Sequence, residues 1–430
     1  MSAKKNKTVP QRLPAAKSSL PGIFGLMFAG MLLVLGVRAN GGEILRMLDL
    51  LPYVLWIFSA LLFALMLRLG RFTGSGKLME LILLLSAVGV LVRSRMEGSV
   101  EGLQGWNHLI QPLGFLWMWL AWIAARKGRV TLFKAFWPFA FVFSLLVIGG
   151  LIVLGNRFRG AYYGPGGLTP SEGLKILIPF ALAGFFSAAE KKWQGRSCWN
   201  PPPGQSVILM FGWGILCALL VLQRDLGLVV LLSLLLVALL IVQTGSWSWG
   251  FLMLAAFGGA GWLILNYLDH GARRFQAWLD PFADPTGSGW QVLQGLSGLY
   301  AGGLTGMGLG GGRPDRLPIA GSDFVYAVYG EELGYLGCVL LLGLFALLLR
   351  QCAAVVNLQK QNFPALLAAA LTAILGVQVL VNISGVVTLL PVTGITLPYI
   401  SQGGSSIWVT SIQFGLLLGL SEPASGKKGK

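Results

Sequence analysis

The chain has 430 residues, of which 55% are hydrophobic and only 11% are charged, and its formal net charge is +16. The mean hydropathy of +0.73 excludes a single water-soluble core and is typical of proteins that cross a membrane several times. We therefore predict an all-α polytopic membrane protein with about 10–12 transmembrane helices and a large extracytoplasmic loop.

Twelve apolar runs, each bounded by charged or turn residues, are candidate spans. A hydrocarbon layer of about 30 Å needs roughly 17 to 25 apolar residues per helix, and several runs reach that length. Backbone polar groups in lipid must be paired within the segment, which favours helices over strands. In chain order the runs are Gly22–Val37, Leu51–Leu67, Leu78–Val92, Leu109–Ala125, Leu132–Gly155, Gly173–Ala189, Gln205–Leu222, Leu226–Gln243, Trp247–Leu268, Phe324–Leu349, Phe363–Val381 and Ile395–Leu420.

Lysine and arginine predict the orientation, because short cytoplasmic loops carry an excess of positive charge. If the N-terminus is inside, 20 Lys and Arg lie on cytoplasmic segments and 11, all of them arginine, lie on the opposite side. We expect both termini to be cytoplasmic and the first apolar run to be a retained helix. The basic runs are short and attached to spans, so anionic inner-leaflet lipid is the expected partner and nucleic acid is not.

The predicted organisation is one membrane domain with two short tails. Residues 1–20 and 421–430 are expected to be cytoplasmic tails, 21–155 an N-terminal set of helices, and 156–420 the core. The core includes the long loop 269–323, whose glycine density argues against a long helix and for a compact, functional loop; a flexible spacer is the alternative. Four cysteines without paired spacing and two histidines predict neither disulfides nor a zinc site.

Ionisable residues near spans cost roughly 2.5 to 3.5 kcal/mol each on insertion, so each is expected to have a partner or a function. Glu172 and Lys175 lie three residues apart, on one face of a first helical turn. The pair fits a salt bridge that lets the helix insert. It fits equally well the mouth of a polar cavity at a helix N-terminus, which favours phosphate.

Two further groups of charges lie at span ends. Asp225 follows Arg224 between two apolar runs, where a hairpin turn explains it as well as a site does. Asp323 begins the tenth run, and Glu331 and Glu332 follow one to three turns into it. Because two adjacent acids in an apolar helix are poorly explained by stability, a functional or structural network is favoured there.

The segment ARRFQAWLDPFADPTGSGW, residues 272–290, is unusually polar for this chain. Each Asp-Pro step keeps the preceding backbone extended, so Asp280 and Asp284 are expected on a stiff rim. Gly287 and Gly289 allow the chain to turn close to another surface. A carboxylate fixed beside an apolar cavity at the membrane surface is a candidate general base, and simple capping of turns is the alternative.

These motifs, in their order and spacing, resemble the SEDS family, the FtsW/RodA/SpoVE proteins of bacterial cell-wall synthesis. The resemblance covers about residues 160–420 and rests on GAYYGPGGLTPSEGLK, LQRDLG, LDPFADPTGSGWQ, GGLTGMGLGGG, LPIAGSDFVYAVYGEELGYLG and QVLVNISGVVTLLPVTGITLPYISQGGSS. It implies a ten-helix core that polymerises lipid II outside the cytoplasmic membrane, together with a class B penicillin-binding protein transpeptidase. It also implies that this chain has an added hairpin before Gly160.

The resemblance assigns roles to particular positions. It implies that Asp284 is the catalytic carboxylate, with Asp280 in reserve. The QPSE, QPDLG, GxGYQ and GGSS motifs of the family correspond to segments of this chain, and Glu331 and Glu332 are expected to be structural. The expected substrate-binding residues are Arg159, Glu172, Lys175, Gln223, Asp225, Asp280, Gln291, Asp323, Ser405 and Ser406.

Several positions depart from the family pattern. Tyr162 and Tyr163 replace the arginines of the GARRW motif, although Arg157 and Arg159 lie just upstream. Arg224 replaces the proline of QPDLG. Two aromatic positions also differ, with Trp290 for tyrosine in GxGYQ and Gln402 for tyrosine in ISYGGSS, and the EAHTDF loop reads IAGSDF. These changes concern expected substrate contacts and leave Asp284 in place.

The expected reaction is inverting glycosyl transfer. Asp284 takes the proton of an acceptor GlcNAc 4-hydroxyl, and that oxygen attacks the anomeric carbon of MurNAc on the donor. The undecaprenyl diphosphate leaving group would be stabilised by Arg159, Lys175, arginines of the outer loops or a bound divalent cation, Mg or Mn. A lipid II flippase and a non-catalytic scaffold of a cell-wall complex are the alternatives.

Overall fold

A computed structural model of the chain describes residues 19–40, 47–96, 107–158, 161–164, 168–195, 199, 204–267, 269–317 and 321–423. Each of the twelve predicted runs contains a long helix, so the all-α prediction is confirmed. The long helices are α1 (Leu20–Asn40), α2 (Leu51–Leu69), α3 (Gly76–Met96), α4 (Asn107–Ala125), α5 (Trp137–Leu154), α6 (Leu174–Ala188), α8 (Gly204–Leu222), α9 (Leu226–Thr244), α10 (Trp247–Tyr267), α13 (Val325–Leu358), α14 (Asn362–Val386) and α15 (Gly404–Leu420).

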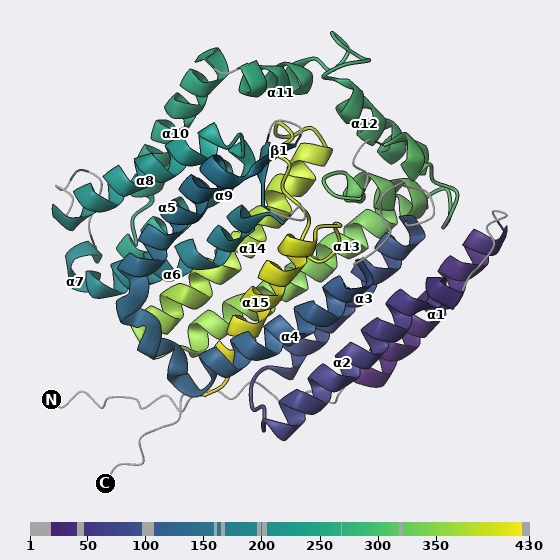
Figure 1. The fold of residues 1–430 in the computed structure, drawn as a ribbon, viewed down its shortest axis with the longest axis horizontal. Coiled ribbons are helices and arrows are strands. Elements are labelled where there is room, and N and C mark those ends of the chain that lie inside the picture. Colours follow the sequence, from purple (N-terminus) through teal and green to yellow (C-terminus); the bar gives the residue numbers. More distant parts are fainter. Residues whose placement is uncertain are drawn as a thin grey trace, which may run out of the picture.

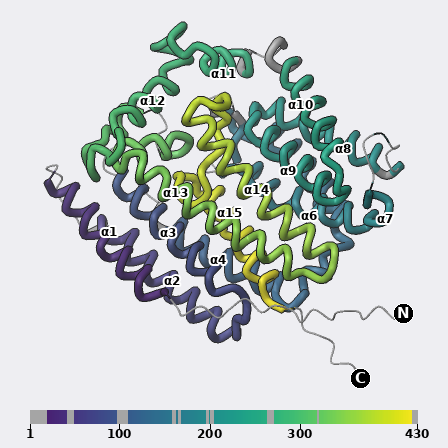
Figure 2. Tube along the Cα trace, turned by 180° about the vertical axis from the view of Figure 1, so that it is seen from behind, coloured from purple at the N-terminus to yellow at the C-terminus, as the bar shows by residue number. Residues whose placement is uncertain are grey.

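The long helices run side by side in one bundle (Figure 1). α13, α14 and α15 lie in the middle, α1 and α2 form one edge, and α8 and α10 lie towards the opposite edge, as the view from behind also shows (Figure 2). Among the described residues, seven segments are long and apolar enough to cross a membrane, with α4 and α5 counted as one run. The many exposed leucines and phenylalanines of the edge helices suit a lipid environment.

Shorter elements gather at the two ends of the bundle. One end carries the strands β1 (Asn156–Phe158) and β2 (Ala161–Tyr163), which pair antiparallel, and the helices α11 (Asp269–Leu279) and α12 (Trp290–Gly302) (Figure 1). The other end carries η2 (Arg126–Phe136) and α7 (Glu190–Trp193). The remaining short helices are η1 (Met47–Leu50), η4 (Pro170–Gly173) and η5 (Pro314–Arg316).

Three of the differences between the observed helices and the predicted runs bear on the site or the helix connections. α15 begins at Gly404 and not at Ile395, because Pro391, Gly394 and Pro398 make residues 387–403 an irregular loop, which we call the α14–α15 loop. α13 extends nine residues past the predicted end at Leu349, to Leu358. The fifth run is divided between η2 and α5.

The loop 269–323 contains the short helix α12, of 13 residues, whose last part lies in the glycine-rich stretch. Glycines of α12 form a flat face against α13 and its preceding turn. A Cβ atom on Gly295 would lie 2.6 Å from the Phe324 ring, and one on Gly302 would lie 2.1 Å from the Gly330 carbonyl oxygen. The helix is stabilised by this close packing, which larger side chains would prevent.

Residues 303–312, which we call the glycine loop, pack against a break in α13. Gly334 has φ 67° and ψ −169°, a backbone conformation open essentially to glycine alone. The break is bridged by backbone hydrogen bonds to the glycine loop: Met307 N to Glu331 O at 3.0 Å, Gly308 N to Glu332 O at 3.0 Å and Tyr335 N to Gly303 O at 2.9 Å. These bonds pair polar groups that the break would otherwise leave unpaired.

Candidate functional site

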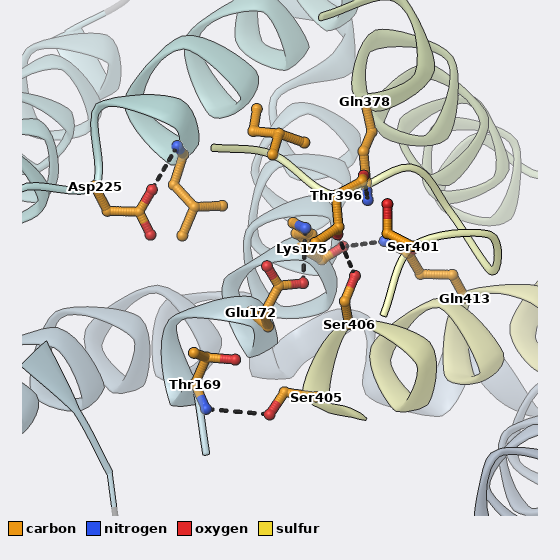
Figure 3. A network of polar contacts seen from close by, with 12 residues as sticks. Thr169, Glu172, Lys175, Asp225, Gln378, Thr396, Ser401, Ser405, Ser406 and Gln413 are labelled. Atoms are coloured by element: carbon orange, nitrogen blue, oxygen red, sulfur yellow. Dashed lines mark hydrogen bonds and ion pairs between the residues drawn. The ribbon is translucent and has the colours of Figure 1, made fainter. Parts of the chain in front are cut away.

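Polar side chains from four segments meet between α6 and α15, and we call them the polar cluster (Figure 3). Thr169 N donates to Ser405 Oγ at 3.1 Å, joining the start of η4 to the start of α15. The Thr396 and Ser406 hydroxyls lie 2.7 Å apart. The members of the cluster are Thr169, Glu172, Lys175, Gln378, Thr396, Ser405, Ser406 and Gln413.

Lys175 lies at the centre of the polar cluster. Its Nζ donates to Glu172 Oε2 at 2.7 Å, and the two side chains are 2% and 17% exposed. The salt bridge that the spacing of three residues suggested is therefore present in the structure. Gln413 Nε2 donates to the Lys175 carbonyl oxygen at 2.8 Å and ties α15 to α6. A buried ammonium held in this way is a fixed positive charge, able to face an anionic ligand group.

Asp225 occupies the turn between α8 and α9, close to this cluster (Figure 3). Its Oδ1 accepts from Leu228 N at 3.0 Å and caps α9, so the hairpin-turn interpretation describes its local geometry. Burial raises the pKa of Asp225, the Leu228 bond and Lys175 lower it, and Glu172 raises it. Asp225 therefore belongs electrostatically to the same charged group as Glu172 and Lys175.

Arg274 of α11 and Asp323 extend this charged group towards the loop region. A Cβ atom on Gly394 would lie 3.8 Å from both Arg274 Nη1 and Asp323 Oδ2, so both side chains border the same point of the α14–α15 loop. Burial raises the pKa of Asp323, and the Arg274 charge opposes that rise. Asn382 Nδ2 fixes the Asp323 carbonyl oxygen at 3.1 Å.

Asp284 lies in the turn between α11 and α12, exposed and outside the polar cluster. Its carboxylate accepts from Ser288 N at 2.7 Å, from Gly287 N at 3.0 Å and from Ser288 Oγ at 3.1 Å. The Ser288 backbone bond, followed by the Ser288 hydroxyl, lowers the pKa of Asp284. Asp280 accepts from Phe282 N at 3.0 Å, so both aspartates cap turns as well as presenting carboxylates.

Glu331 and Glu332 lie away from the polar cluster, in the first turns of α13 under the glycine loop. Arg95 Nη2 of α3 contacts Glu332 Oε1 at 3.1 Å, and both side chains are nearly buried. Glu331 borders Gly298 of α12, where a Cβ atom would lie 3.7 Å from its Oε2. Through these contacts the two acids of α13 lie against α3 and α12.

The other predicted residues are separate from the cluster or not described. Arg159 lies outside the described residues. Gln223 is buried in the turn before Asp225, and Gln291 lies in the first turn of α12. Arg157 packs its guanidinium over the Tyr162 ring, 4.9 Å from the ring centre, and donates to the Tyr162 hydroxyl. This pairing places a cation beside the position where the family pattern has arginine.

A divalent cation has no ready-made protein site in the described part of the chain. That part contains no group of three or more His, Cys, Asp or Glu side chains arranged to hold a metal ion.

Sequence reasoning missed residues whose partners are distant in the chain. Gln378, Thr396 and Gln413 were not singled out, although polar side chains within apolar runs are a usable signal. Arg274 and Trp278 were also missed as contact residues; their spacing of four on one amphipathic segment is the signal that could have indicated a shared helix face.

The family model of FtsW, RodA and SpoVE, described as "Cell cycle protein", matches residues 75–425. The chain belongs to the FtsW/RodA/SpoVE family. It is 31% identical over 368 residues to the peptidoglycan glycosyltransferase RodA of Mycobacterium tuberculosis, covering 81% of this chain and 78% of that protein. It is 32% identical over 311 residues to the stage V sporulation protein E of Bacillus subtilis, covering 71% and 80%.

Solved structures agree with the FtsW/RodA/SpoVE assignment. One chain of a peptidoglycan synthase complex, described as coordinating polymerization and crosslinking, aligns with a TM-score of 0.65 and 27% identity, covering 81% of this chain and 97% of that one. The rod shape determining protein RodA of Thermus thermophilus has the same fold, with a TM-score of 0.58 and 24% identity over 81% of this chain and 96% of that one. The helices α1 and α2 precede the residues matched by the family model.

Proposed function

We propose that this member of the FtsW/RodA/SpoVE family is a peptidoglycan glycosyltransferase that polymerises lipid II at the outer face of the bacterial cytoplasmic membrane, for cell division or elongation. The observation that carries the proposal is the Asp284 carboxylate, held rigidly by three donors in a loop that has the family's DPxxDPxGxG pattern. The similarity to RodA of Mycobacterium tuberculosis, which is named a peptidoglycan glycosyltransferase, supports the activity.

Asp284 acts as the general base. It takes the proton of the GlcNAc 4-hydroxyl, whose oxygen forms a bond to C1 of MurNAc with inversion while the bond from C1 to the diphosphate oxygen breaks. A positioned base contributes roughly 10²- to 10⁴-fold to such a step. Hydrogen bonds lower the pKa of Asp284 in the free enzyme, and burial of the carboxylate by bound sugars would raise that pKa towards the value of an effective base.

The polar cluster binds the charged and hydroxylated parts of the substrate. Lys175 supplies a fixed cation for the diphosphate leaving group, while Ser405 and Ser406 offer hydroxyl groups at the start of α15. The other proposed contacts are Arg159, Glu172, Gln223, Asp225, Asp280, Gln291 and Asp323. The apolar tails stay in the bilayer while the sugars react at its surface.

The orientation and organisation are part of the same proposal. Both termini are cytoplasmic, the loop 269–323 is outside, and residues 156–420 form the catalytic core. The added hairpin is α1–α2, because these helices precede the matched residues 75–425 and ten long helices remain after them. A class B penicillin-binding protein transpeptidase is the proposed partner that cross-links the product.

Polymerisation of fluorescent lipid II by the purified protein in detergent tests the function. We expect wild type to make glycan strands and Asp284→Ala, at the same folded yield, to make none. Asp315→Ala, at an exposed acid of η5 outside the proposed machinery, serves as the matched control and should retain activity. The assay is run with and without the cognate transpeptidase.

The same assay separates the alternatives. Translocation has no meaning in a micelle, so a flippase would give no polymer with or without the partner. A scaffold would give no polymer, yet would still bind the partner. Full activity of Asp284→Ala would remove Asp284 from the reaction.

A further inference from the structure

Two side chains of α11 hydrogen-bond to backbone carbonyl groups of the α14–α15 loop. Arg274 Nη1 donates to Val392 O at 3.1 Å, and Trp278 Nε1 donates to Thr388 O at 2.8 Å. Both the donors and the acceptors are spaced four residues apart. One face of α11 is therefore fastened to one stretch of the α14–α15 loop.

The α14–α15 loop, which supplies the acceptor carbonyl groups, also contributes Thr396 to the polar cluster. Thr396, four residues after Val392, shares a hydrogen bond with Ser406, and its carbonyl oxygen accepts from Gln378 Nε2 at 2.8 Å. Thr388 has φ 59°, a conformation uncommon for a residue with a branched side chain, which persists where surrounding contacts hold it. The indole bond to its carbonyl oxygen is one such contact.

The helix α11, which supplies the donor side chains, is followed directly by the turn that carries Asp284. Asp280 N continues the hydrogen bonding of α11 by donating to Gln276 O at 2.9 Å, and Gly289 N donates to Asp284 O at 3.0 Å. With the side-chain caps of Asp280 and Asp284, the turn 280–289 is internally bonded. The turn is therefore expected to move with α11.

The charges around Arg274 favour the same position of α11, next to the α14–α15 loop. The Arg274 guanidinium lies in the field of two carboxylates, Asp323 and Asp225, which both stabilise its charge against burial. The preceding Arg273 is exposed and makes no hydrogen bond or ion pair with the described residues. Only one of the two adjacent arginines is thus engaged with the core.

We propose that Arg274 and Trp278 are positioning residues, which clamp α11 to the α14–α15 loop and so fix the Asp284 carboxylate relative to the polar cluster. The role rests on the proposed function of Asp284. A reaction between bound sugars is sensitive to displacements of about 1 Å, which can cost roughly 100-fold in rate. The clamp therefore acts on kcat, and substrate affinity depends on it little.

The test uses Arg274→Gln and Trp278→Phe, with Arg273→Gln as the matched control of equal charge change. In the lipid II assay we expect kcat to fall roughly 10- to 100-fold in the first two with KM little changed. Arg273→Gln should equal wild type. Arg274→Lys keeps the charge and a donor and should recover part of kcat. Because both bonds fasten the same helix, the double variant should lose less than the product of the two single losses.

A distance measurement tests the clamp independently of enzymatic activity. Spin labels at Thr286→Cys and Leu389→Cys, both exposed sites, are placed in a chain whose four natural cysteines are alanine. We expect a narrow distance distribution in wild type and Arg273→Gln, and a broad one in Arg274→Gln and Trp278→Phe.

If the distance distributions of Arg274→Gln and Trp278→Phe were as narrow as that of wild type, the proposed clamp would be wrong, whether or not kcat falls. Broadened distances with full kcat would overturn its role in positioning Asp284. If wild type makes no polymer, the proposed function fails, and the distance measurement still decides whether the clamp exists.

Discussion

Hydrogen bonds from Ser288 and Gly287 lower the pKa of the Asp284 carboxyl group, because they favour its ionised form. Activity that requires this base is present above its pKa and is lost as the pH falls through it. Removing one donor with Ser288→Ala raises the pKa, so the acid limb of the kcat/KM profile should move to higher pH. The measurement is the pH–rate profile of lipid II polymerisation for both proteins.

Ser288→Thr is the control, since it keeps the hydroxyl group and should leave the acid limb where it is in wild type. An acid limb unaffected by Ser288→Ala would mean that another group controls the ionisation seen in kcat/KM.

The Glu172–Lys175 pair predicts an asymmetry between single and double substitutions. Lys175→Met leaves the partly buried Glu172 carboxylate without its partner at 2.7 Å and should destabilise the fold by about 3 kcal/mol, as breaking a buried ion pair does. Glu172→Gln/Lys175→Met removes both charges and should recover much of that loss. Thermal unfolding in detergent measures both, and a double variant no more stable than Lys175→Met would contradict the pairing.

Single residues could be predicted from the sequence where their partners are local. The Glu172–Lys175 pair follows from a spacing of three on a helix. The spacing of Arg274 and Trp278 could indicate a shared helix face, but their acceptors could not be predicted, because these lie 118 and 110 positions later in the chain. Contacts of a side chain with a distant backbone carbonyl leave no pattern in the local sequence.

The break in α13 depends on one glycine. Gly334→Ala would force an alanine into a region of φ and ψ that costs of order 1–3 kcal/mol, and its Cβ would lie 2.3 Å from Gly306 N. We expect a clear fall in the unfolding midpoint and loss of polymerisation. Gly343→Ala, in the same helix with nothing within 4 Å of its Cβ position, should be neutral or slightly stabilising.

If both glycine variants unfolded at the same temperature, the conformation of Gly334 would not be important for stability.

Helices could be predicted from the sequence where hydropathy alone determines their position. All twelve apolar runs contain helices, because length and apolarity determine whether a segment spans a membrane. The irregular α14–α15 loop was missed because its residues are nearly as apolar as a span. α12 was missed because its glycines are stabilised by tertiary packing on Phe324 and Gly330, which intrinsic propensity does not report.

At the scale of the whole molecule, the hairpin that precedes the family match contacts the glycine loop. Gly310 has φ 83°, and its Cβ position is 1.9 Å from Val37 Cγ1 of α1. Gly308 has a similar φ of 88° with open space around it. Gly310→Ala should therefore lower the unfolding midpoint more than Gly308→Ala does.

Val37→Ala combined with Gly310→Ala removes the overlap and should bring the midpoint up to that of Gly308→Ala. Equal midpoints for the two single variants would show that α1 does not constrain the glycine loop.

The reaction proposed for Asp284 can occur only if its loop faces outward, where lipid-linked sugars meet the growing strand. Reaction of Thr286→Cys with a membrane-impermeant maleimide in intact cells tests this directly, with Lys191→Cys at the opposite end of the bundle as the control. We predict that Thr286→Cys is labelled in intact cells and that Lys191→Cys is labelled only after permeabilisation. Labelling of Thr286→Cys only in permeabilised cells would contradict the account.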